Sequence, residues 1–159
     1  MRYRIIAILL FLIVCAPIPT QTVLAATHYD LTLTPIDFGS VAPFTPQYLS
    51  FASPTAWTIA YRGSAPATGQ LVGVYAEPVT DFAANFPATR IEFWDGQGDP
   101  SDPTYQALQY GQQTSVCYML DVSKRVDTAI PVYMRLNVTG AEDPGSYTAT
   151  IRVTAYEIP

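Results

Sequence analysis

Residues that carry enzyme chemistry are few in this chain, and they do not fall into a catalytic spacing. His28 is the only histidine, and it lies at the very start of the domain that we expect to remain after export. Such a position is a poor framework for the base of a Ser–His–acid triad, and a nucleophilic Cys117 would have to recruit the same histidine. No Gly-x-Ser-x-Gly elbow and no His/Cys metal spacing occurs. We therefore expect a non-enzyme, with no catalytic residue, no metal site and no cofactor.

Acidic and aromatic residues at 92–102 suggest two kinds of binding site. Asp95, Asp99 and Asp102 have carboxylate oxygens, which are the kind of ligand that Ca²⁺ binds. One Ca²⁺ ion takes six to eight oxygen ligands. Their spacing matches no regular calcium loop, and the same residue types favour a solvated turn, which is the interpretation that we prefer. Trp94, flanked by Glu92 and Asp95, would suit sugar stacking, although a core or rim tryptophan is the commoner case.

Residues 1–26 have the parts of a secretory signal peptide. Arg2 and Arg4 precede an unbroken apolar run of ten residues, and small residues at 23–26 offer a cleavage point. The run is too short to span a bilayer, which takes ~20 apolar residues. We expect a mature domain of residues 27–159 without a membrane span, secreted to the extracellular space or cell surface, with the periplasm as the alternative compartment.

The composition fits a single acidic β domain. Without the two N-terminal arginines the chain has six basic and thirteen acidic residues, a net charge of −7. This balance argues against nucleic acid or an anionic membrane as the partner. Loss of Cys15 with the signal peptide leaves Cys117 alone, so we expect no internal disulfide and a buried, inert thiol. Asn137 begins a glycosylation sequon that we expect to stay unmodified, because the signal peptide looks bacterial.

Alternation of apolar and polar residues dominates the chain, and it predicts strands that bury one face. The clearest runs are 29–34, 57–62, 130–138 and 147–156, and further strands are expected near 36–41, 70–77, 89–94, 105–110 and 115–122. Segment 80–86 suits one helical turn. Seven to nine short strands predict an all-β, antiparallel two-sheet sandwich with an immunoglobulin-like arrangement, and a closed barrel is the alternative.

Single residues within these strands carry expectations of their own. Pro131 cannot donate a ladder hydrogen bond, so its strand is expected at a sheet edge, or with pairing that starts after the proline. Gly39 suits a bend where a side chain would crowd the neighbouring sheet. Phe38, Trp57 and Tyr147 are expected as large buried anchors of the core.

Two segments carry a family resemblance. The first is residues 33–43, with Asp37-Phe38-Gly39 at its centre, followed by Trp57-Thr58-Ile59, and the second is residues 145–155, which begins Gly145-Ser146-Tyr147. Together they resemble secreted bacterial immunoglobulin-like modules, as found in spore coat protein U-like domains, pilus-subunit domains and WxL-type surface proteins. The resemblance implies the same sandwich fold over most of residues 28–158.

These observations predict a non-enzymatic surface-structure or adhesion module that acts through protein–protein contacts at sheet edges and loop tips. Its partners would be proteins at the cell surface or further copies of itself. One alternative is a self-assembling pilin or coat subunit that donates residues 27–34 to a neighbour, although we favour pairing of this segment within its own domain. Another alternative is a carbohydrate- or calcium-dependent binding module using residues 92–102.

Overall fold

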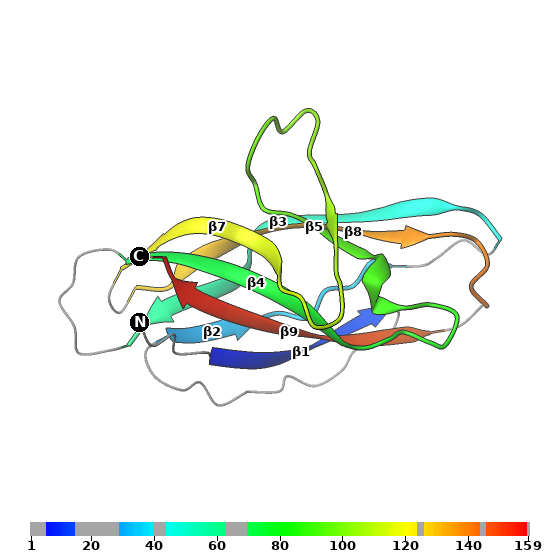
Figure 1. The fold of residues 1–159 in the computed structure, drawn as a ribbon, viewed down its shortest axis with the longest axis horizontal. Helices are drawn as coiled ribbons and strands as arrows, with labels where there is room; N and C mark the ends of the chain where they lie inside the picture. Colours follow the sequence, from blue (N-terminus) through cyan, green and yellow to red (C-terminus); the bar gives the residue numbers. More distant parts are fainter. Residues whose placement is uncertain are drawn as a thin grey trace.

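Two antiparallel sheets pack face to face in the computed structural model of this chain (Figure 1). The structure describes residues 6–14, 29–39, 44–62, 70–123, 126–143 and 146–158. The first sheet has the order β1-β9-β4-β7, and the second has the order β2-β3-β8-β5-β6. The strands are β1 (Ile6–Val14), β2 (Tyr29–Leu33), β3 (Gln47–Tyr61), β4 (Gln70–Thr80), β5 (Ile91–Trp94), β6 (Gln106–Ala107), β7 (Thr114–Val122), β8 (Thr128–Val138) and β9 (Tyr147–Glu157).

Alternation along the strands builds the core as expected, and the all-β sandwich prediction is confirmed. In β8 every second residue from Ile130 to Val138 is buried, and the residues between them are half-buried. Trp57 is fully buried, and its indole Nε1 donates a hydrogen bond to the carbonyl of Thr34 at 3.0 Å. Buried Trp and Tyr side chains need such a partner for their polar atom. Tyr147 and Phe38 are only partly buried against the core, less deeply than expected.

Six of the strands follow the order of an immunoglobulin-like sandwich. Strands β2-β3-β8-β5 follow the order A-B-E-D of one immunoglobulin sheet, and β4-β9 follow C-F of the other. In that arrangement strand G lies beside strand F, antiparallel to it. Here the place beside β9 is taken by β1, which comes from the start of the chain (Figure 1). Among the described residues, no strand follows β9 in the sequence.

Several local expectations were wrong. Residues 36–39 form no strand, and residues 40–41 lie outside the described part. The strand expected at 105–110 shrinks to β6, and 80–86 forms a tight turn in which Phe86 N donates to Ala83 O, not a helical turn. Gly39 has nothing within 4 Å of a built Cβ, so crowding does not explain it; its φ of +75° does.

Pro131 lies inside the second sheet, which contradicts the expectation of an edge strand. β8 runs between β3 and β5. Its pairing with β5 covers only 133–136, so on that side the ladder does start after the proline. On the β3 side the register shifts between Ser53 and Trp57, and this irregularity lies opposite Pro131. Neither ladder therefore requires the N–H donor that Pro131 lacks.

Helical structure is limited, within the described residues, to the 3-10 turn η1 (Ala88–Arg90). None of the described helical segments has the length and apolar character needed to span a membrane.

Candidate functional site at the β9 edge

The edge of β9 that faces away from β4 is covered by β1 along almost its whole length. Nine consecutive pairs join the two strands, from Ile6 opposite Ala155 to Val14 opposite Tyr147, without a register shift. β1 lies within the predicted signal peptide, which we expect to be removed. Without β1 the backbone N–H and C=O groups of this long regular edge would have no strand to pair with.

β9 presents two chemically different faces to a neighbouring strand. The side chains of Ala149, Ile151, Val153 and Ala155 belong to the core between the sheets and are at most 1% exposed. The residues between them lie on the opposite face, and they include Arg152. A strand beside β9 therefore needs apolar residues at alternate positions on the core-facing side, while its other face meets threonines and one arginine.

A tyrosine fixes the start of β9. The Tyr147 hydroxyl donates a hydrogen bond to the backbone carbonyl of Asp143, four residues upstream. Its ring packs edge-on against Phe86, with ring centroids 5.3 Å apart. A tyrosine near the start of strand F that bonds back to the preceding loop is a mark of immunoglobulin-like sandwiches, called the tyrosine corner. This contact supports the assignment of β9 as strand F.

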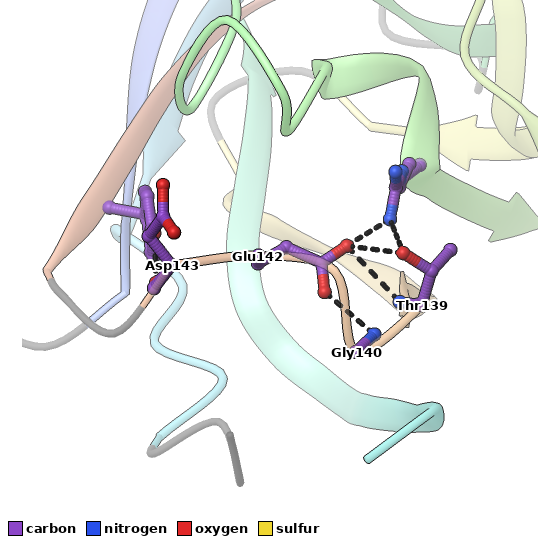
Figure 2. Close-up of polar contacts among 6 residues, drawn as sticks. Thr139, Gly140, Glu142 and Asp143 are labelled. Carbon is purple, nitrogen blue, oxygen red and sulfur yellow. Dashed lines mark hydrogen bonds and ion pairs between the residues drawn. The ribbon is translucent and has the colours of Figure 1, made fainter. Parts of the chain in front are cut away.

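A buried carboxylate orders the turn just before this tyrosine. Glu142 is only 4% exposed, and its oxygens accept hydrogen bonds from Thr139 N at 3.1 Å, Thr139 Oγ1 at 2.9 Å and Gly140 N at 2.8 Å (Figure 2). Arg90 of η1 also donates to Glu142. Asp143 lies on the other side of the turn and takes no part in this set of bonds (Figure 2). Burial raises the pKa of Glu142, but the hydrogen bonds from Thr139 and Gly140 outweigh it and hold this pKa below its usual range.

Two of the other described sheet edges are short, one is irregular, and residues 47–53 of β3 pair only with β8 among the described residues. β2 has five residues and β6 has two. β7 is interrupted where its pairing with β4 jumps from Leu120 to Cys117, and Met119 in this bulge has a left-handed φ of +58°. Short strands and bulges are the common means by which proteins prevent unwanted edge pairing. Among these edges, that of β9 has the longest run of pairs without a register shift, which makes it our candidate to receive a strand.

In the aspartate-rich loop, residues 95–102, two carboxylates accept hydrogen bonds from the loop itself. Asp95 Oδ1 accepts from the backbone N–H of Gln97 at 3.0 Å, and Asp99 Oδ1 accepts from Ser101 N at 2.8 Å. These bonds are those of a self-capping turn, the interpretation that the sequence favoured. In the part of the chain that the structure describes, no group of three or more His, Cys, Asp or Glu residues is placed to hold a metal ion. The loop between β5 and β6 stands out from the sandwich (Figure 1).

Trp94 is not presented as a sugar-stacking platform. It is 8% exposed, and its indole Nε1 donates to the carbonyl of Gln97 at 2.7 Å. Its ring packs against Tyr133, with centroids 5.0 Å apart. Glu92, proposed beside it, instead accepts a hydrogen bond from Arg135 Nε at 2.6 Å. Trp94 is thus a buried residue that packs on the outer face of the second sheet, outside the core cluster.

Sequence reasoning missed a stacked arginine on the outer face of the second sheet. The guanidinium of Arg135 lies between two rings, 4.3 Å from the centroid of Tyr48 and 4.2 Å from that of Tyr105. These three residues come from β3, β8 and the loop before β6, far apart in the sequence. Only the alternate position of Arg135 on the outer face of its strand was visible beforehand.

Cys117 and Asn137 both lie within strands. Cys117 is 5% exposed, which confirms the expected burial of its thiol, and burial, with a further contribution from Asp95, raises its pKa to about 11. Asn137 is half-buried in β8, and the expectation that it stays unmodified remains a prediction. His28 lies outside the described residues.

Comparisons of this chain with protein-family models, with curated proteins and with solved structures found no match. The resemblance to secreted bacterial immunoglobulin-like modules therefore stays a prediction.

Proposed function

We propose that this chain is a secreted, non-enzymatic surface-structure or adhesion module, and that it contacts a protein partner by accepting a strand at the β9 edge. One observation carries the proposal: residues 6–14 occupy the position of strand G over nine pairs, yet they belong to the predicted signal peptide. After export the same edge would need a replacement strand from another chain. Addition of a strand to an open sheet edge is a common mode of peptide recognition, in which backbone bonds give affinity and alternate side chains give specificity.

The source of the replacement strand distinguishes an adhesion or surface module from a self-assembling subunit. Residues 27–34 were the sequence-based candidate for donation to a neighbour. Of these, Tyr29–Leu33 pair within the same chain with residues 57–61 of β3, which agrees with the alternative that we favoured. Self-assembly of this protein would thus need a donor other than these five residues, and we place a separate protein partner first.

The test uses the chain exported with its own signal peptide and purified after processing. Light scattering and negative-stain microscopy at rising concentration are combined with a titration of a synthetic apolar strand that copies residues 6–14. A monomer that binds the peptide supports acceptance of a partner strand. Oligomers that the peptide dissolves support strand acceptance between copies. A chain that binds no peptide, in either state, contradicts the proposal.

A further inference from the structure

Arg152 lies at the middle of β9 on the face away from the core, and it has few partners. Glu77 lies directly opposite it on β4, with Arg152 Nη1 3.6 Å from Glu77 Oε2. This distance allows an ion pair but is longer than a normal hydrogen bond. The side chain of Arg152 is 41% exposed, which leaves it open to a second neighbour.

The other arginines of the described residues are held more tightly. Arg62 donates to both Asp30 and Asp127 at 3.0 and 3.1 Å. Arg90 donates to Glu142 and Thr139, and Arg135 donates to Glu92 and is stacked between two tyrosines. Arg152 is the one arginine of the described ranges that makes no hydrogen bond within those ranges, and guanidinium groups favour carboxylates that can accept such bonds.

The second neighbour of Arg152 is set by the register of the sheet. On the β1 side, the residue opposite Arg152 is Leu9. In an antiparallel pair, directly opposite residues lie on the same face with their Cβ atoms ~4.5–5.5 Å apart, close enough for an ion pair. Leucine carries no charge, so the residue at this register position cannot form an ion pair with Arg152.

We propose that the strand accepted at the β9 edge carries a carboxylate at the position that Leu9 occupies, opposite Arg152. This inference rests on the proposed strand acceptance and adds the chemistry of the partner. The partner strand is apolar at alternate positions that face the core, and it is acidic at the fourth of its nine positions. Arg152 would then lie between two carboxylates across three strands, with Glu77 on one side and the partner's acid on the other.

A series of peptides tests whether the exported and processed chain prefers a strand with a carboxylate opposite Arg152. The peptides copy residues 6–14 with Thr in place of Ala7, Phe11 and Ile13, and with Glu, Gln or Lys in place of Leu9. We expect the Glu peptide to bind roughly tenfold more tightly than the Lys peptide, with Gln between them, and we expect added salt to reduce the difference. Fluorescence polarisation of labelled peptides measures each affinity.

Variants of the chain and one control peptide locate the effect at the arginine. Arg152→Gln should remove the preference for the Glu peptide over the Lys peptide, and Arg152→Glu should reverse it. Glu77→Gln should increase this preference, because the carboxylate that competes for Arg152 is gone. A control peptide has Gln in place of Leu9 and Glu in place of Ile13. Its affinity should be the same for the unaltered chain and for the Arg152 variants. Far-ultraviolet circular dichroism checks that each variant is folded.

The outcomes separate this inference from the proposed function. Equal binding of the Glu, Gln and Lys peptides to the unaltered chain would overturn the proposed carboxylate opposite Arg152 and leave strand acceptance intact. Absence of binding by all peptides would overturn both. A preference for Glu that persists in Arg152→Gln would assign the discrimination to another group and overturn the role of Arg152.

Discussion

At the scale of single residues, the least expected feature is the buried carboxylate of Glu142. Four donors converge on it from Thr139, Gly140 and Arg90, and the turn that it orders leads directly into β9. The sequence offered no signal for this role, because Glu142 and Asp143 are adjacent acids in a loop. Arg90 lies 52 residues away in the chain, so only the packing of η1 against the turn distinguishes the two acids.

Replacement of Glu142 by Ala should lower the free energy of unfolding by about 2–3 kcal/mol, because buried donors lose their acceptor. Asp143→Ala is the matched control and should change it by no more than about 0.5 kcal/mol, since that side chain is exposed. Urea denaturation measures both. Equal losses in the two variants would show that Glu142 has no special structural role.

The same residue predicts a pH dependence. The pKa of Glu142 is lowered in the folded protein, so its charged form stabilises the fold at pH values above the unfolded pKa of about 4.3. This contribution is lost as the pH falls through the lower, folded pKa. Denaturation curves taken between neutral and acidic pH should show the loss, and Glu142→Gln should make that part of the profile flatter. An unchanged profile would argue against the lowered pKa.

Cys117 should react slowly with a thiol reagent in the native protein. Its thiol is 5% exposed, and with a pKa of about 11 only a small fraction is thiolate near pH 8. Unfolding in guanidinium should remove the protection and accelerate the reaction by orders of magnitude. The reaction is followed by absorbance with an aromatic disulfide reagent. A fast native reaction would mean that β7 opens readily.

At the scale of elements, the bulge in β7 stores backbone strain. Met119 has φ of +58° and is 51% exposed, so its conformation suits glycine and its side chain packs little. Met119→Gly should raise the free energy of unfolding by about 0.5–1 kcal/mol. Met119→Ala keeps the strain and serves as the control, with little change expected. A destabilised glycine variant in urea denaturation would show that the side chain matters more than the backbone.

β2 ties the two sheets together at one end of the sandwich. Its five residues pair with β3, and the Tyr29 hydroxyl lies 2.7 Å from Gln70 Oε1 and 3.1 Å from Glu157 Oε1 in the opposite sheet. Deletion of residues 27–34 should therefore abolish cooperative thermal unfolding monitored by circular dichroism. A deleted chain that still folds and only fails to assemble would restore the donation hypothesis for this segment.

At the scale of the whole molecule, the first sheet depends on which strand lies beside β9. In the chain from which residues 1–26 have been removed, we expect the amides of β9 to exchange hydrogen faster than those of β4, which keeps neighbours on both sides. Addition of the apolar peptide should slow the exchange of β9 selectively. Hydrogen exchange with mass spectrometry measures this. Equal protection of β4 and β9 without peptide would mean that β9 already has another neighbour.

The sequence by itself determined the strand-rich composition, most strand positions and the two-sheet sandwich. These follow from alternation, a local property: every second residue of 130–138 is apolar, whatever lies beside it. The same local reasoning predicted a strand where residues 36–39 form none. It also left open whether Pro131 marks a sheet edge or a late start of pairing, because it could not foresee a bulge on the neighbouring strand.

Only the tertiary structure decided which strands are neighbours. Backbone N–H and C=O groups pair without regard to side chains, so alternation alone does not choose between partners for a strand. That choice places residues 6–14 beside β9 and brings Arg90 to Glu142. It also leaves the side chain of Arg152 partly exposed. The candidate site lies at a boundary between strands, and such boundaries exist only once the sheets have assembled.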